Sequence, residues 1–485
     1  MDTGEVSTIM PSPKISHNRI RFLAFLYLVL VYLFGTLKFG AWSDDFWSLE
    51  DPHAHFLHAV KDGRPIYGWA IEFLFSMFTS VESLKYIRLL GLVGLLLFSD
   101  AAIRYLLDKK LTYQVVIASL VAFTLPSFQL SVHWAIAFCM GWTGFLALQG
   151  LILWGRSGLR PRILGVVLFS VSLLIYPLLS FFIFAIMFVD LYLSSLSLSA
   201  IYQRVKTVFP LLILGGLLSA TVSRIVLLIL DLEYNPRVEI ISLSQLPEKL
   251  IWFLTRPLLL SYRPFLIDSP STVIIGMQFA IFSLALVLLI FLRLKELRKA
   301  FFFLIFLNLN LAMGLFPFLM STQNQIEVRF LSSNTWLVTF LFVNLIFSAI
   351  SSVCNLRKRL ERQVIVMVST ALLAFGGYSV NDRYVNFIQP IQKVSRDFIL
   401  GEIQKCTATE LKLGVEVVQR VSPWPSRNLL GMYSQVTDLA SEWVPIGAVK
   451  MILTEKSPLL NRVGPIDWGQ GSSIKCVVDL NLFHN

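Results

Sequence analysis

Long apolar segments separated by short polar ones alternate along the first 378 residues of the chain. Many of these segments approach the ~20 apolar residues that a helix needs to cross the hydrocarbon core of a bilayer. The pattern therefore predicts an all-α polytopic membrane bundle of about eleven transmembrane helices. We place these helices at residues 22–37, 86–107, 112–125, 135–154, 163–175, 178–193, 207–230, 272–292, 301–318, 333–353 and 364–378.

Two polar connections are long, at about 38–85 and 231–271, and residues 379–485 have the composition of a soluble domain. Within the first of them, the apolar segment 66–80 carries Glu72 and reaches only ~22 Å as a helix, short of the ~30 Å hydrocarbon core. We expect this helix to lie on the membrane surface. Helical and alternating patterns in the tail predict a small α/β domain, with helices near 384–405 and 428–442 and strands near 415–421, 447–454 and 474–480.

The distribution of basic residues predicts the orientation of the bundle. If the N-terminal segment 1–21 lies in the cytoplasm, the connections on that side are short and strongly basic, as the positive-inside rule requires. The short connections on the other side contain a single basic residue, Arg329. We therefore expect a cytoplasmic N-terminus and an extracytoplasmic domain at 379–485.

Composition supports a membrane protein and excludes two other classes. The chain is 56% hydrophobic and 15% charged, whereas soluble domains carry roughly 25% charged residues. Its 39 Phe, 11 Trp and 14 Tyr exclude a disordered chain. Basic residues flank the spans, so the net charge of +11 is no sign of a nucleic-acid partner.

The four cysteines form neither a disulfide framework nor a CxxC metal motif. Cys406 and Cys476 both fall in the exported tail, where an oxidising compartment allows a disulfide between them. Two separate buried thiols are the alternative.

Two adjacent acids, Asp44 and Asp45, follow the first span within the sequence Trp-Ser-Asp-Asp-Phe-Trp. Partial burial among aromatic rings raises the pKa of a carboxyl group and suits it to accept a proton. The alternative is a helix N-cap, supplied by Ser43 or Asp44. Because adjacent side chains diverge by ~100° on a helix, only one acid can face a substrate hydroxyl, and we favour Asp44.

Arginines in the outer connections are candidates for binding a phosphate, because a guanidinium group can contact it in a bidentate way. Arg64 lies in a Gly-Arg-Pro turn, and Arg329 stands alone before the span 333–353. In the second long connection, basic residues alternate with Trp252 and Tyr262. Contacts with lipid headgroups, with Glu327 for Arg329, or ordinary interfacial anchoring are the alternatives. The candidates for phosphate binding are Arg64, Arg329, Arg237, Arg256 and Arg263.

No metal site or cofactor is implied by the sequence. His53, His55 and His58 have a spacing that could ligate zinc, but no second ligand group matches them, and interfacial histidines are the favoured interpretation. Asp100, Asp190 and Arg224 sit near the ends of spans, so the sequence predicts no chain of ionisable groups at the membrane midplane. This argues against an ion-coupled transporter.

The cytoplasmic N-terminus, the single span and an outer loop that opens with Asp44 and Asp45 resemble the GT-C superfamily of integral-membrane glycosyltransferases. The sequence Asp-Asp-Phe followed by Gly63-Arg64-Pro65, with the isolated Arg329 before a late span, is similar to the serotype-converting glucosyltransferase family. That family glucosylates the O-antigen of bacterial lipopolysaccharide from a polyprenyl-phosphate-glucose donor.

The resemblance implies a bacterial inner-membrane enzyme with a periplasmic active site and an inverting mechanism. An acid of the first loop would deprotonate the acceptor hydroxyl, and arginines would neutralise the departing phosphate. Its partners would be the lipid-linked donor, a glycan acceptor and the bilayer, with a lipid-sugar flippase and a polyprenyl-phosphate sugar synthase acting beside it. Two alternatives stay open: an exporter of lipid-linked sugars, with polar residues along the bundle centre, and an O-antigen polymerase or ligase.

Overall fold

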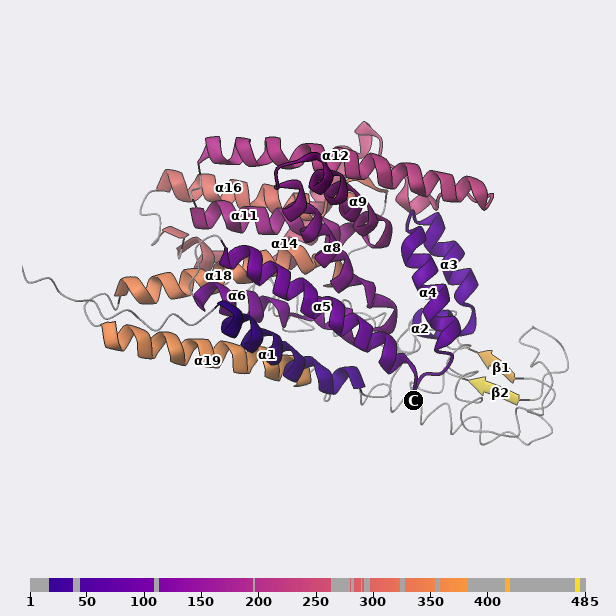
Figure 1. Cartoon of the computed structure of the whole chain (residues 1–485), viewed down its shortest axis with the longest axis horizontal. Coiled ribbons are helices and arrows are strands. Elements are labelled where there is room, and N and C mark those ends of the chain that lie inside the picture. The colour runs from indigo at the N-terminus through magenta and orange to yellow at the C-terminus, as the bar shows by residue number, and fades with distance from the viewer. Residues whose placement is uncertain are drawn as a thin grey trace, which may run out of the picture.

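A computed structural model shows the helices that make up the bundle. The long helices run roughly along one axis, horizontal in Figure 1, and a group of shorter helices lies across one end of them. The described residues are 17–37, 44–108, 113–194, 197–262, 280, 283–288, 290–291, 297–322, 328–353, 358–382, 415–418 and 476–479.

Within these residues, six helical segments are long and apolar enough to cross a membrane, and a bent pair brings the number to seven. The six comprise α1 (His17–Leu37), α5 (Leu84–Leu107), η1 with α8 (Ala135–Ala137 and Cys139–Trp154), α12 (Leu198–Ile229), η4 with α18 (Val328–Leu331 and Ser332–Val353) and α19 (Lys358–Asp382). The bent pair is α6 (Tyr113–Phe123) and α7 (Pro126–His133), which meet at 62°. Pro126 has no N–H to continue the α6 hydrogen bonding, which explains the break.

Shorter apolar helices complete the bundle: α9 (Leu159–Ile175), α10 (Pro177–Ser180), α11 (Phe182–Ser194), α16 (Leu297–Gly314) and α17 (Phe316–Met320). Ten of the eleven predicted spans thus coincide with helices. The eleventh, 272–292, lies mostly outside the described residues. The prediction of a helical membrane bundle is confirmed. The number of eleven membrane crossings stays a prediction.

Helices α5 and α8 approach closely through glycines. A Cβ atom added to Gly141 would lie 2.3 Å from the backbone nitrogen of Leu95 and 2.5 Å from the carbonyl carbon of Gly94. Such small residues let two helix backbones touch inside a membrane, where packing replaces the hydrophobic effect as the source of association. The glycines thus allow the backbones of α5 and α8 to lie in direct contact.

We expect Gly141→Ala to lower the free energy of unfolding by about 1–3 kcal/mol, because the methyl group would meet backbone atoms that cannot rotate away. Gly216→Ala on α12 is the matched control, since nothing lies within 4 Å of its added Cβ. There alanine should be neutral or stabilising by up to ~1 kcal/mol, as helix propensity favours it. Thermal unfolding of the two purified variants checks this pair. Equal melting temperatures would contradict the close contact.

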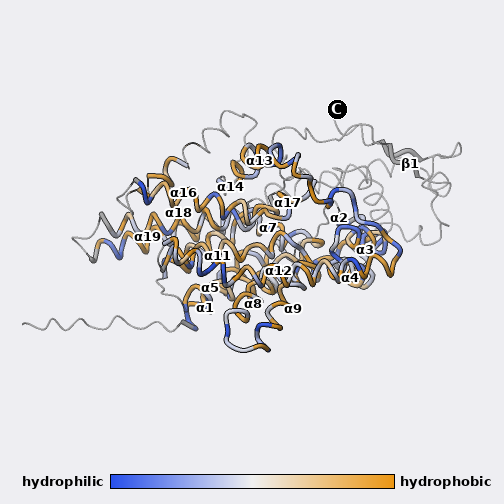
Figure 2. The backbone as a smooth tube through the Cα atoms, turned by 90° about the horizontal axis from the view of Figure 1, so that it is seen from above, coloured by the Kyte–Doolittle hydropathy of each residue, from blue (hydrophilic) through white to orange (hydrophobic). Residues whose placement is uncertain are grey.

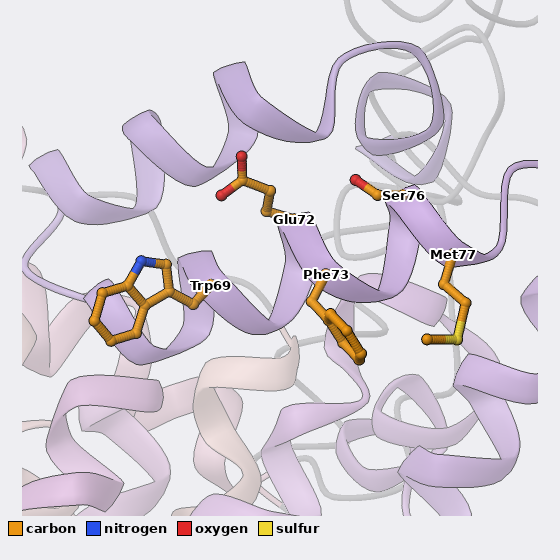
Figure 3. Close-up of a pocket in the computed structure, with 5 residues that line it drawn as sticks. All are labelled: Trp69, Glu72, Phe73, Ser76 and Met77. Atoms are coloured by element: carbon orange, nitrogen blue, oxygen red, sulfur yellow. The ribbon is translucent and has the colours of Figure 1, made fainter.

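Three short helices lie across one end of the bundle (Figure 1): α2 (Asp44–Glu50), α3 (Pro52–Lys61) and α4 (Pro65–Met77). Asp51 caps α3 by accepting a hydrogen bond from the Ala54 amide at 2.8 Å. Helix α4 corresponds to the predicted short helix at 66–80. Its exposed Trp69, Phe73 and Met77 border a shallow hollow on the surface, as Figure 3 shows, which suits the predicted position against a membrane surface.

Two short strands belong to the C-terminal segment. Strand β1 (Val415–Val418) pairs in parallel with β2 (Cys476–Asp479), where strands were expected. In Figure 1, β1 lies toward the same end of the bundle as α2–α4, and Figure 2 shows that α2, α3 and α4 also lie together at one end of the bundle when it is seen from above. The other predicted elements of 379–485, and Cys406, lie outside the described residues. The α/β domain and the Cys406–Cys476 disulfide therefore stay predictions.

Candidate functional site

Three segments that are distant in sequence meet beside α3 and α4. They are the α3–α4 turn, the 3-10 helix η2 (Pro236–Val238) with the residues after it, and the segment that follows α17. Backbone hydrogen bonds run from Asn235 N to Lys61 O (2.9 Å), from Ile241 N to Met320 O (3.0 Å) and from Thr322 N to Glu239 O (3.0 Å). The second long connection is thereby held between the first long connection and a later one.

An ion cluster forms where these segments meet. The Nε atom of Arg237 donates to Oδ1 of Asp62 at 2.8 Å, and Nη2 atoms of both Arg237 and Arg64 contact Oδ2 of the same carboxylate. Arg237 Nη2 also donates to Nε2 of His58 at 2.7 Å, because a guanidinium can only donate. The structure thus brings together two predicted phosphate-binding residues from different connections.

Burial and charge set the protonation states of this cluster. Burial opposes ionisation of Asp62, but Arg64 and Arg237 outweigh it and hold the pKa of its carboxyl below the usual value. Burial also opposes the charge on Arg64, yet Asp62 keeps its pKa raised. Burial lowers the pKa of His58, so its imidazole is neutral at pH 7. Two cations and one anion leave a net charge of +1.

The Gly-Arg-Pro sequence explains how Arg64 reaches this place. Gly63 has a φ of +75°, a conformation that suits glycine, and its carbonyl accepts a hydrogen bond from Ser223 Oγ at 2.9 Å. Pro65 then begins α4 in the first helical turn, where its missing N–H is tolerated. The guanidinium carbon of Arg64 lies 5.3 Å from the centre of the Tyr67 ring. The structure thus contains the tight Gly63-Arg64-Pro65 turn that the sequence predicted.

The two candidate acids begin α2, and the structure describes the side chain of one of them. Asp45 has no exposed area, and its Oδ1 accepts a hydrogen bond from the Ile136 amide at 3.0 Å. This carboxylate links α2 to η1 in the bundle. The side chain of Asp44 lies outside the described part, so its role as the base stays a prediction.

The three histidines of α3 contact three different sets of partners. His53 Nδ1 lies 2.7 Å from Glu72 Oε1, whereas His55 Nδ1 lies 2.6 Å from Ser48 Oγ, and His58 contacts Arg237. The His55 ring also stacks on Trp47 at 4.5 Å between centroids. Within the described residues, no group of three or more His, Cys, Asp or Glu is placed to hold a metal ion.

We expect the protein to lose stability in acid because the imidazole of His55 is buried. Burial, with smaller contributions from Arg64 and His58, lowers its pKa from 6.5 to about 3. The unfolded chain therefore binds more protons between these values, and stability falls as pH drops below about 6.5. By pH 5 the expected loss is about 2 kcal/mol. Thermal unfolding at pH 5 and 7 measures it.

His55→Gln should reduce the difference in melting temperature between pH 5 and pH 7, because the buried imidazole is then absent. An unaltered pH dependence in His55→Gln would contradict the assignment.

The remaining candidate arginines occupy separate places. Arg329 in η4 is half-buried, with its guanidinium carbon 4.4 Å from the centre of the Trp134 ring. Trp134 directly precedes η1, so this guanidinium lies near the start of the η1–α8 segment. Arg256 is exposed between α13 (Leu246–Thr255) and α14 (Pro257–Ser261), and Arg263 lies outside the described part.

Sequence reasoning missed Asp62 and Arg88. Asp62 reads as an ordinary turn residue between Lys61 and Gly63, and no local signal indicates that two arginines share it. Arg88 is fully buried within the first turns of α5, and its Nε donates to Thr36 O at 3.2 Å. A cation inside an apolar span was the signal that could have found it.

The described site combines a cationic cluster with carboxylate-bearing helix α2 at the same end of a membrane bundle. The guanidinium groups of Arg64 and Arg237 are partly exposed there, whereas the carboxylate of Asp45 is fully buried. Comparison with known proteins adds no family to this description: no protein-family model matches the chain, and no curated protein is significantly similar to it.

Proposed function

We propose that the chain is a membrane glycosyltransferase that moves a sugar from a polyprenyl-phosphate donor to a surface glycan. Glucose as the sugar and bacterial O-antigen as the acceptor follow from the resemblance to the serotype-converting glucosyltransferases. The observation that carries the proposal is the pairing of Arg64 and Arg237 around Asp62, at the end of the bundle that begins α2 with Asp44 and Asp45.

In the proposed reaction, Asp44 takes the proton from an acceptor hydroxyl while that oxygen attacks the anomeric carbon of the sugar. The bond from this carbon to the phosphate oxygen breaks, and the lipid phosphate leaves with the bonding electrons. Arg64, Arg237 and Arg329 neutralise its charge, and the single displacement inverts the anomeric configuration. Asp45 holds α2 against η1 through the Ile136 amide.

Two acidic residues within the spans, Asp100 and Asp190, are each paired with an arginine. Asp100 of α5 binds Arg21 through two hydrogen bonds of 2.8 and 2.6 Å, and Asp190 of α11 contacts Arg204. Paired in this way, these intramembrane carboxylates act as structural links between helices. Arg88 lies near the α2–α4 end of α5, where it bonds to the last turn of α1.

Arg329→Lys tests the proposed phosphate contact. Lysine keeps the charge but loses the planar fork, so sugar transfer from a polyprenyl-phosphate donor should fall at least about tenfold while expression holds. Arg162→Lys is the matched control, because Arg162 also lies over a tryptophan, 5.7 Å from the Trp154 ring, on another part of the bundle. Full activity of Arg329→Ala would remove Arg329 from the site.

A further inference from the structure

Asp62 and His58 form part of the cationic cluster but have no role in the reaction described above. The carboxylate of Asp62 is almost fully buried, with 3% of its side chain exposed, whereas the side chains of Arg64 and Arg237 are 20% and 39% exposed. The anion thus lies beneath two cations that reach the surface. This arrangement differs from a surface ion pair, in which both partners face water.

Each guanidinium retains donors beyond those that the cluster uses. A guanidinium carries five N–H groups. Arg237 binds its neighbours through Nε and Nη2, and Arg64 binds Asp62 through Nη2. The Nη1 atoms of both residues therefore have no partner in the cluster, and the cluster has a net charge of +1. These are the requirements for binding one further anion.

We propose that Asp62 is a positioning residue, which holds Arg64 and Arg237 side by side so that their remaining N–H groups receive the phosphate of the lipid donor. This proposal rests on the proposed function and deepens it, because it assigns phosphate binding to Arg64 and Arg237 and their orientation to Asp62. Asp62 itself does not touch the phosphate. His58 fixes the rotation of Arg237 by accepting its Nη2 hydrogen bond.

Two physical reasons favour positioning by a buried carboxylate. Two guanidinium groups repel each other, so without an anion between them they would separate. Both side chains also lose much rotational freedom on binding a ligand, and a side chain already held in place loses less. The backbone supports the same geometry, because Asn235 N binds Lys61 O and Ser223 binds Gly63 O.

The experiment is calorimetric titration of the purified full-length protein in detergent with farnesyl phosphate, a short prenyl phosphate. Asp62→Asn keeps the shape of the side chain and removes its charge. We expect this variant to bind farnesyl phosphate at least tenfold more weakly and to raise the KM for the lipid donor more than it lowers kcat. Asp100→Asn, which alters the Arg21–Asp100 pair on α1 and α5, is the matched control and should bind normally.

The direction of the change decides between two roles for Asp62. If Asp62 only repelled the phosphate, Asp62→Asn would bind farnesyl phosphate more tightly. Equal or tighter binding by a folded Asp62→Asn variant would overturn the proposal. Should that variant fail to fold, the half-exposed Arg237→Gln replaces it: tenfold weaker binding supports the site, and unchanged binding overturns it.

Two further ligands identify the source of the phosphate. Farnesol should not bind measurably, and inorganic phosphate should bind far more weakly than farnesyl phosphate. Equal binding of inorganic phosphate would overturn the assignment to a lipid headgroup. A protein that binds farnesyl phosphate but transfers no sugar would refute the proposed function alone, whereas active transfer with normal binding by Asp62→Asn would refute the positioning role alone.

Discussion

Asp44→Asn is expected to slow sugar transfer by about 10²–10⁴-fold, the usual consequence of losing a general base. Asparagine has nearly the same shape and still accepts a hydrogen bond, so a capping role at the start of α2 would survive the change. Protein level and melting temperature should therefore stay close to those of the unmodified chain. The measurement is the initial rate of transfer from a polyprenyl-phosphate-sugar donor by the purified variant.

Asp45→Asn is the control that the neighbouring acid offers. Its side chain accepts from the Ile136 amide, and asparagine can keep that bond. We expect a stability loss of ~1 kcal/mol and most of the activity to remain. Near-normal rates in both variants would remove the catalytic role of this loop, and loss of activity only in Asp45→Asn would exchange the roles of the two acids.

Arg204→Leu is expected to destabilise the bundle by about 3–5 kcal/mol, because it leaves the charge of Asp190 buried without its cation. The side chain of Asp190 is 2% exposed and contacts Arg204 from α12, and it accepts from the Tyr105 hydroxyl of α5 at 3.2 Å. The carboxylate of Asp190 on α11 thus links this helix to both α5 and α12. Thermal unfolding in detergent measures the loss.

The double variant Asp190→Asn/Arg204→Leu tests the cause of that loss. Removing the charge of Asp190 should restore most of the stability, since the cost comes from a buried carboxylate that has lost Arg204 rather than from missing contacts. A double variant no more stable than Arg204→Leu alone would show that packing of the arginine stem, not charge, links these helices.

The bundle was largely predictable because membrane spans depend on local composition. An apolar run that satisfies its own backbone hydrogen bonds forms a helix wherever it lies in the sequence. The end of the span at 125 was predicted, but residues 126–134 were expected to be a connection, whereas Pro126–His133 form α7 at 62° to α6. The polar residues Ser127, Gln129, Ser131 and His133 are typical of a connection, yet the bundle buries them.

The site was predictable only in part, because it depends on contacts between distant segments. The Gly63-Arg64-Pro65 turn is a local signal, and the structure contains it. The approach of Arg237 to Arg64 depends on how one long connection crosses another, which no periodicity in the sequence indicates. Nothing in the sequence around Asp62 indicates that its carboxylate binds two arginines, one of which is distant in the chain.

Reconstitution of the purified protein in vesicles shows directly whether it transfers a sugar at the membrane. The purified chain would be placed in vesicles that contain polyprenyl-phosphate-glucose labelled in the sugar, with an O-antigen acceptor outside. We expect the label to move to the acceptor with inverted anomeric configuration, and Asp44→Asn to slow this transfer by about the same 10²–10⁴-fold. Label that crosses the bilayer while still attached to its lipid, with none on the acceptor, would refute sugar transfer and identify an exporter instead.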